Sequence, residues 1–248
     1  MPADQRAESR RDPLFASYPD LAAEIECQRA GSSWALTGAS ALVVSGPDML
    51  MEIGKPRHWR HDRDGAAHIG LGAIGGSLEA GETLLACLER EGREELGTAL
   101  EIQSAEETAF CFDEQRVSRV TPAPRAAHPL PCLITVGENR YRRTAIAART
   151  LAIATYWARV SGETRLGDLY GLVAIPIAAV SDLLAALPVP GQELLAWPGV
   201  RVALSGPLPP EAIVEPVWTI QTLRQVLLAG DLSAPPSLAI EGMRRFYR

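Results

Sequence analysis

The chain has 248 residues, of which 47% are hydrophobic and 22% are charged, as in an ordinary globular protein. This length is sufficient for one large domain, or for one domain with appendages. The formal net charge of −6 argues against a protein that coats nucleic acid, because such proteins need a basic surface. Lys55 is the one lysine among 24 basic residues, which indicates a compositional bias rather than recognition.

The N-terminal half predicts a short helix, two strands and a glycine-rich segment. The helix is expected over residues 14–30, after a polar start that contains no signal peptide. Two apolar runs, 34–45 and 48–53, predict strands that are joined by a turn at Ser45-Gly46-Pro47-Asp48. A charged loop is expected next, and then a glycine-rich strand or loop whose backbone approaches something closely.

The segment after these glycines predicts an amphipathic helix. Leucines recur at helical spacing and form a stripe that can pack on a sheet: Leu84, Leu85, Leu88 and Leu96. We expect Gly81-Glu82 to open this helix, since a carboxylate in the first turn is favoured by the helix dipole. Gly97 is expected to close it, because glycine accepts the left-handed conformation that often ends a helix.

The remaining chain alternates strands and helices without the rhythm of a doubly wound sheet. Strands are predicted within 99–115 and over 150–163, a strand and then a helix over 169–187, and an amphipathic helix over 217–230; 116–149 and 188–217 are expected to be irregular. Pro176 and Asp182 interrupt the apolar run of 169–187, so it does not predict a membrane span, and Ser181-Asp182 has the form of a helix N-cap. The pattern predicts an α/β (α+β-type) mixed sheet between helices.

Compartment and partners follow from composition. Four cysteines fit no metal-ligand spacing and indicate reduced thiols: Cys27, Cys87, Cys111 and Cys132. We therefore expect a soluble, cytoplasmic protein without a membrane partner, and the sequence leaves a homodimer open.

Three glutamates of the predicted central helix have the spacing of a metal site. Glu91, Glu94 and Glu95 lie at i, i+3 and i+4, so their carboxylates project from one face of the helix, where like charges repel. Arg90 can offset part of this charge. Clustered carboxylate oxygens suit a hard divalent cation, Mg²⁺ or Mn²⁺, which shares its shell with phosphate oxygens. The alternative is a salt-bridged surface helix, which leaves the flanking glycines unexplained.

This stretch resembles the Nudix hydrolase family, whose signature is G-x5-E-x7-R-E-U-x-E-E-x-G-U with U a bulky apolar residue. All seven fixed positions of the signature are present: Gly76, Glu82, Arg90, Glu91, Glu94, Glu95 and Gly97. Both U positions depart from it, because Gly92 and Thr98 stand there. Gly92 should cost the helix about 1 kcal/mol relative to alanine, but it removes no ligand.

The resemblance implies a Nudix-like α/β/α sandwich over 34–187, with an N-terminal extension of 1–33 and a C-terminal extension of 188–248 that has one helix. It implies that Glu91, Glu94 and Glu95 bind the metal, joined by the Gly75 carbonyl, that Arg90 orients the glutamates, and that Glu82 supports the site. The implied activity is metal-dependent hydrolysis of the phosphoanhydride in a nucleoside diphosphate linked to another group. The alternative is a ligand-sensing or protein-interaction domain of the same fold, although such domains commonly lose one of these glutamates.

Several residues outside the signature are open to two interpretations. The general base could be Glu94, Glu95, or a later acid, Glu163 or Asp168, which the sequence otherwise places in an ordinary turn. Four aromatic residues could stack on a base, but core packing is the more common role: Trp59, Tyr156, Trp157 and Tyr170. The four histidines share no ligand spacing. Arg140, Arg142 and Arg143 lie in a basic segment that would attract a diphosphate if it reached the site.

Overall fold

The computed structural model describes residues 12–123, 128–139, 146–160 and 162–230. Its helices, in chain order, are α2 (Pro13–Ser17), α3 (Pro19–Gln28), the 3-10 helix η1 (Pro56–His58), α4 (Leu84–Leu96), α5 (Ile177–Ala186), α6 (Gly191–Ala196) and α7 (Trp218–Leu228). Its strands are β1 (Trp34–Ser45), β2 (Asp48–Ile53), β3 (Arg60–His61), β4 (Ala67–Gly72), β5 (Ile74–Ser77), β6 (Glu101–Gln103), β7 (Thr108–Phe112), β8 (Arg116–Val120), β9 (Leu133–Glu138), β10 (Thr150–Arg159), β11 (Gly171–Pro176), β12 (Val189–Pro190), β13 (Arg201–Leu204) and β14 (Ala212–Pro216).

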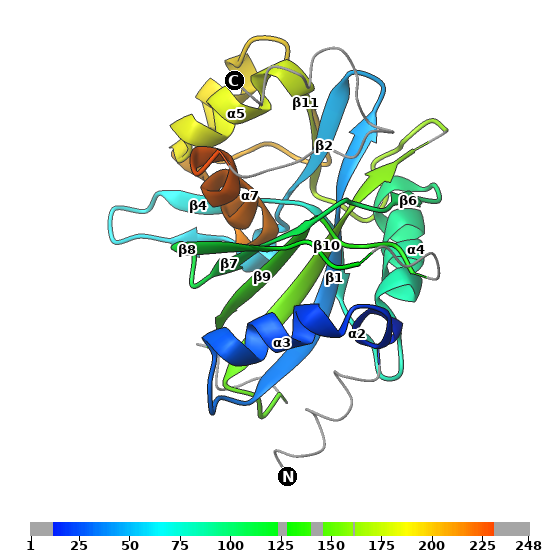
Figure 1. Cartoon of the computed structure of the whole chain (residues 1–248). Coiled ribbons are helices and arrows are strands. Elements are labelled where there is room, and N and C mark those ends of the chain that lie inside the picture. The colour runs from blue at the N-terminus through cyan, green and yellow to red at the C-terminus, as the bar shows by residue number, and fades with distance from the viewer. Residues whose placement is uncertain (1–11, 124–127, 140–145, 161, 231–248) are drawn as a thin grey trace.

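One mixed sheet organises the molecule. Its longest path runs β12-β14-β4-β2-β1-β10-β9-β7-β8, and β11, β13, β3, β5 and β6 join it at the sides. The central pair, β1 and β10, is parallel, whereas β1 pairs antiparallel with both β2 and β5. Figure 1 shows helices on both sides of this sheet, with α4 apart from α5 and α7. The predicted mixed sheet between helices is therefore confirmed.

Each face of the sheet carries its own apolar core. On one face α2, α3 and α4 pack around Trp34, Leu88 and Phe110, and on the other α5, α6 and α7 pack around Trp157, Leu183 and Leu223. Alternate residues of β1 serve the two cores, as the period of a strand requires: Ala41 and Val43 lie in the first and Leu42 and Val44 in the second.

The predicted strands 34–45 and 48–53 coincide with β1 and β2, whereas three other expectations are corrected. The segment 116–149 contains β8 and β9, and β9 is a buried apolar run whose signal is masked by the prolines and arginines around it. The helix α5 begins at Ile177 rather than at Ser181, because Pro176 supplies its N-cap. The expected opening at Gly81-Glu82 is also wrong: α4 begins at Leu84.

The C-terminal extension contributes to the same sheet. β14 runs parallel to β4, and β12 pairs with β14 at the sheet edge. The expectation of one helix there is corrected, since α6 precedes the predicted α7; α6 has six residues, too few to show a helical period. The boundaries at 33/34 and 187/188 stay predictions, and residues 1–11 and 231–248 lie outside the described part of the chain.

Two other expectations meet direct observations. All four cysteines are free, as predicted. Within the described residues, no helix combines the length and the apolar character that crossing a membrane requires.

The ends of α4 are fixed by specific contacts. Thr83 is its N-cap, and its side chain accepts a hydrogen bond from the Ala86 N–H at 3.3 Å. Asp12 adds a second cap from far along the chain, because its Oδ2 accepts from the Leu84 N–H at 3.0 Å while its Oδ1 accepts from the Leu14 N–H at 2.8 Å. Gly97 ends the helix with φ +68°, the predicted left-handed cap.

The buried glycine of α4 generates a stability prediction. An added Cβ at Gly92 would lie 2.8 Å from Leu100 Cγ and 3.1 Å from the Thr98 carbonyl oxygen, closer than atoms pack. We expect Gly92→Ala to lower the free energy of unfolding by about 1–3 kcal/mol, through overpacking. Gly137→Ala is the control, since nothing lies within 4 Å of a Cβ there. Thermal melts of both variants test this, and a Gly92→Ala protein as stable as the wild type would contradict it.

Candidate metal and active site

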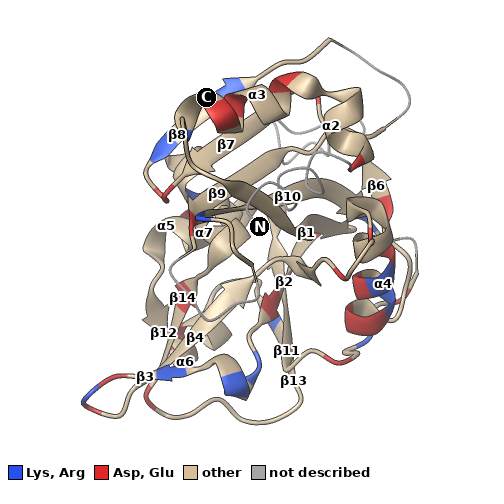
Figure 2. Cartoon of the chain, turned by 90° about the horizontal axis from the view of Figure 1, so that it is seen from below, with Lys and Arg blue, Asp and Glu red and all other residues tan. Residues whose placement is uncertain are grey.

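The helix α4 presents its glutamates at three different depths. Glu95 is 5% exposed and belongs to the buried face, Glu91 is half-buried, and Glu94 is exposed. Acidic and basic residues alternate along α4 in Figure 2. The i, i+3, i+4 spacing therefore produces a gradient from protein interior to solvent rather than three equivalent carboxylates.

Arg90 connects these acids to the loop before the helix. Its Nε and Nη2 each donate to one oxygen of Glu82 at 3.0 Å, the two-pronged geometry that suits a carboxylate. Its Nη1 donates to Glu91 at 2.7 Å and to Glu94 at 3.3 Å. Glu82 also accepts from the Glu79 N–H at 2.9 Å. We call the signature segment Gly76–Thr98 the box. Within it Arg90 contacts Glu82, Glu91 and Glu94, although the roles of Arg90 and Glu82 stay predictions.

Two consecutive glycines of β5 contact the carboxylates of Glu91 and Glu95 on α4. Gly75 has φ +142°, and its N–H donates to Glu95 Oε2 at 2.9 Å. A Cβ at Gly76 would overlap Glu91 Oε1, so a larger residue there would expel that side chain. The glycine-rich segment was expected to approach something closely, and here it approaches two glutamates of the box.

Glu52, on β2, is a site residue that the sequence did not indicate. A Cβ at Gly72, its partner on β4, would lie 2.6 Å from Glu52 Oε1, so glycine makes room for this acid as well. Glu52 interacts electrostatically with Glu91 and Glu95. The available signal was a carboxylate within the apolar run "MLMEI", where a strand side chain needs a reason to be charged.

A later loop folds back onto the end of α4 and brings Asp168 to the group. The N–H groups of Arg165, Gly167 and Asp168 donate to the carbonyls of the last turn of α4 at 3.0–3.1 Å. Asp168 forms an ion pair with Lys55 at 2.6 Å. Of the two later acids considered as the general base, Asp168 is therefore beside the site, whereas Glu163 is exposed to solvent on that loop.

Burial and like charge raise the pKa of the deeper acids. Burial raises the pKa of Glu95 to about 9, with Glu52 adding to the effect, and burial raises the pKa of Glu52 to about 7. Burial also raises the pKa of Glu91, while Arg90 opposes that shift. The pKa of Glu82, by contrast, is lowered by its hydrogen bonds from Arg90. The deeper carboxylates thus retain protons unless a cation replaces them.

A hard divalent cation fits this group in donor chemistry, since every candidate ligand is a carboxylate or backbone oxygen. In the present conformation Arg90 holds oxygens of Glu91 and Glu94 that such an ion would use. Accordingly, the described part of the chain contains no set of three or more His, Cys, Asp or Glu side chains already arranged to hold a metal ion. The metal ligands Glu91, Glu94, Glu95 and Gly75 therefore stay a prediction.

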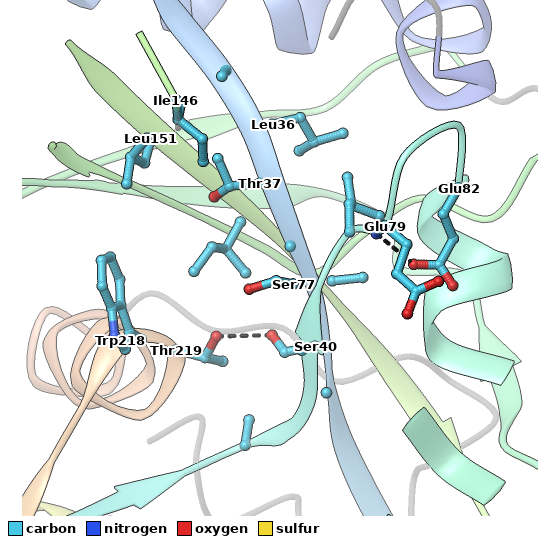
Figure 3. Close-up of a pocket in the computed structure, with 18 of the residues that line it drawn as sticks. Leu36, Thr37, Ser40, Ser77, Glu79, Glu82, Ile146, Leu151, Trp218 and Thr219 are labelled. Atoms are coloured by element: carbon cyan, nitrogen blue, oxygen red, sulfur yellow. Dashed lines mark hydrogen bonds between the residues drawn. The ribbon is translucent and has the colours of Figure 1, made fainter. Parts of the chain in front are cut away.

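A cavity of about 850 Å³ opens beside the acids. Its lining comes from β1, β5, the loop before α4 and the start of α7, and includes Glu52, Glu79 and Glu82. Figure 3 shows Glu79 and Glu82 on one side of β1 and β5, and Trp218 and Thr219 on the other. None of the described lining residues is lysine or arginine, so a bound anion would need another source of positive charge.

The other predicted residues do not add to this group within the described part of the chain. Arg140, Arg142 and Arg143 fall outside the described residues. Tyr156 and Trp157 are buried, one in each core. Trp59 packs edge-to-face on Tyr170, with 5.2 Å between the ring centroids. Packing within the protein therefore accounts for all four aromatic residues without a ligand.

Comparisons with known proteins give similarities in structure alone. No protein-family model and no curated protein matches the chain. Among solved structures, it is similar to a MutT Nudix hydrolase from Burkholderia pseudomallei (21% identity, 62% of this chain and 86% of that chain, TM-score 0.29). It is also similar to a mutator MutT protein from Bacillus halodurans (20% identity, 60% of this chain and 73% of that chain, TM-score 0.32). A third similar structure is a Nudix-family hydrolase from Clostridium perfringens (13% identity, 60% of this chain and 83% of that chain, TM-score 0.36).

The buried acids generate a prediction on pH and stability. The pKa of Glu95 is higher in the folded protein than in the unfolded chain, so the folded state keeps a proton that the unfolded state releases. With chelator present, the free energy of unfolding should therefore fall from pH 7 to pH 9, by up to about 1.4 kcal/mol per pH unit for this group. Glu95→Gln should flatten that slope, while Glu89→Gln, on the exposed face, should leave it unchanged. Denaturant melts across this range measure the slopes, and equal slopes for all three proteins would refute the assignment.

Proposed function

We propose that the protein is a Nudix-type hydrolase that needs Mg²⁺ or Mn²⁺ and cleaves a phosphoanhydride bond in a nucleoside diphosphate linked to another group. The observation that carries the proposal is the complete glutamate set of α4, of which Glu91 and Glu95 contact two glycines, Gly75 and Gly76, that line a cavity large enough for a ligand. A surface helix held by salt bridges would have no need to bury Glu95 or to exclude side chains at Gly75 and Gly76.

In this proposal Glu91, Glu94 and Glu95 hold the cation, together with the Gly75 carbonyl. When bound, the cation supplies positive charge that neutralises diphosphate oxygens and makes water more acidic. Arg90 orients the glutamates, and Glu82 anchors Arg90 through its two-pronged contact. Because no described lining residue is basic, the cation is the main local charge that can attract the diphosphate, unless Arg140, Arg142 and Arg143 reach it.

The reaction adds water across the P–O–P bridge. The water oxygen forms a bond to one phosphorus, the bridging P–O bond breaks, and the bridging oxygen leaves with the second phosphate. A carboxylate accepts the proton that water loses. We take Glu94 and Asp168 as the candidates, because both are exposed and lie beside the group, and Asp168 forms an ion pair with Lys55.

We further propose that 34–187 carries the hydrolytic machinery and that the extensions complete it. The N-terminal extension supplies the Asp12 cap of α4, and the C-terminal extension supplies Trp218 and Thr219 to the cavity wall.

Metal removal and single glutamate changes test the proposal. We expect hydrolysis of at least one nucleoside diphosphate derivative with Mg²⁺ or Mn²⁺, and none with excess chelator. Glu94→Gln and Glu95→Gln should each lower kcat by orders of magnitude, because loss of one ligand charge weakens metal binding without emptying the core. The reaction yields two phosphate monoesters, so phosphate released from them by an added phosphatase, across a panel of nucleotide substrates, measures this.

Glu89→Gln is the matched control, since Glu89 lies on the same helix at a position that the signature leaves variable, and it pairs with Arg93. It should keep full activity, and all variants should melt cooperatively. Full activity in chelator would refute the proposal. Saturable nucleotide binding without hydrolysis of any substrate would favour the alternative, a ligand-sensing domain.

A further inference from the structure

Trp218 is an exposed aromatic residue at the cavity that the proposed chemistry leaves unused. It is 47% exposed, whereas Trp34 and Trp157 are fully buried. The described residues include three large exposed apolar side chains, at Leu195, Trp218 and Leu228, and of these only Trp218 lines the cavity. A large ring left in solvent beside a concave site is a feature of ligand-binding surfaces.

The backbone at Trp218 is held in a conformation that bulky residues rarely adopt. Its φ is +45°, in the left-handed region. Both neighbours are fixed: the Val217 N–H donates to the Leu71 carbonyl at 3.1 Å, and Thr219 Oγ1 lies 2.8 Å from Ser40 Oγ in a hydrogen bond. Val217 also packs against Gly70: a Cβ added at Gly70 would lie 2.9 Å from Val217 Cγ2. Such strain persists where the surroundings fix it, and it commonly marks functional positions.

A short series of contacts joins Trp218 to the acids. Thr219 bonds to Ser40, Ser40 is the register partner of Gly75 across β1 and β5, and the Gly75 N–H donates to Glu95. This series links the start of α7 to Glu95 through the strand pair β1 and β5. In Figure 3 Trp218 lies on one side of these strands, and Glu79 and Glu82 lie on the other.

The two ends of the cavity differ in chemistry. In Figure 3 the apolar side chains of Ile146 and Leu151 lie on the same side of β1 as Trp218, whereas Glu79 and Glu82 lie on the other side. The apolar end therefore suits a neutral, planar group, and the box end suits the charged part of a ligand once a cation is present. A nucleoside diphosphate has these two parts in one molecule.

We propose that Trp218 is the specificity residue that stacks on the base of the substrate, while the diphosphate extends to the box glutamates. This inference rests on the proposed function, because it takes the substrate to be a nucleoside diphosphate derivative. Stacking on an indole face tolerates any base, so Trp218 selects for the presence of a base rather than for one particular base.

Trp218→Gly separates binding from folding. Glycine adopts a positive φ without strain, so this variant should melt at or above the temperature of the wild type. It should nevertheless raise KM, and the Kd of ADP and of UDP, by about 10-fold or more, with little change in kcat. Trp218→Phe keeps an aromatic face and should restore most of the affinity. Leu228→Ala, on the same helix but away from the cavity, should behave as the wild type.

Inorganic pyrophosphate, which has no base, is the second probe. Its binding in the presence of Mg²⁺ should be equal in the wild type and in Trp218→Gly. If Trp218→Gly melts below the wild type, Trp218→Leu supplies the comparison, because it retains a bulky side chain at that position; it should lose affinity for ADP as well. Unchanged affinity for ADP and UDP in a folded variant that lacks the ring would overturn the inference.

The two proposals fail in different ways. Hydrolysis that depends on Mg²⁺ but is insensitive to Trp218 would overturn the stacking role and leave the hydrolase standing. Nucleotide binding that depends on Trp218, without hydrolysis of any substrate, would support the stacking role and overturn the hydrolase. A wild-type protein that neither binds nor hydrolyses any nucleotide would overturn both.

Discussion

The burial of Glu95 is the constraint around which the site is arranged. A carboxyl group that is 5% exposed needs a hydrogen-bond donor, and the Gly75 N–H of β5 supplies it. The next residue of the strand, Gly76, leaves room for Glu91. The loop that ends in Asp168 then covers the carbonyls at the end of α4. Helix and strand are thus held together by the need to accommodate a buried carboxyl group, and the loop is held by hydrogen bonds to the end of the helix.

Much of this could be predicted from local sequence. Residues 75–97 are close in sequence, so helical spacing and the left-handed cap at Gly97 place the glutamates on one helix without knowledge of the fold. Glu52 and Asp168 could not be placed in this way, since they reach the site through strand pairing and through a loop that folds back from far along the chain. Their sequence surroundings resemble those of an ordinary strand and an ordinary turn.

The C-terminal extension shows a different limit of prediction. β12 and β14 are short and bounded by prolines, and what stabilises them is their pairing with each other and with β4, which no local pattern reveals. Trp218 is a related case. Its position at the start of an amphipathic helix was predictable, but its exposure and its positive φ depend on how Val217 and Thr219 are held by other strands. The residue was therefore visible in sequence, and its surroundings were not.

Asp12 makes the helix α4 depend on the N-terminal segment of the chain. One oxygen of its carboxylate caps α2 and the other caps α4, so a single side chain closes two helices that are 70 residues apart in the chain. Loss of an N-cap typically costs about 1 kcal/mol; here α2 would lose its cap, and α4 would keep Thr83 but lose its second cap. A substitution at Asp12, which also lines the cavity, can therefore loosen the glutamate helix without altering any of the glutamates that the helix carries.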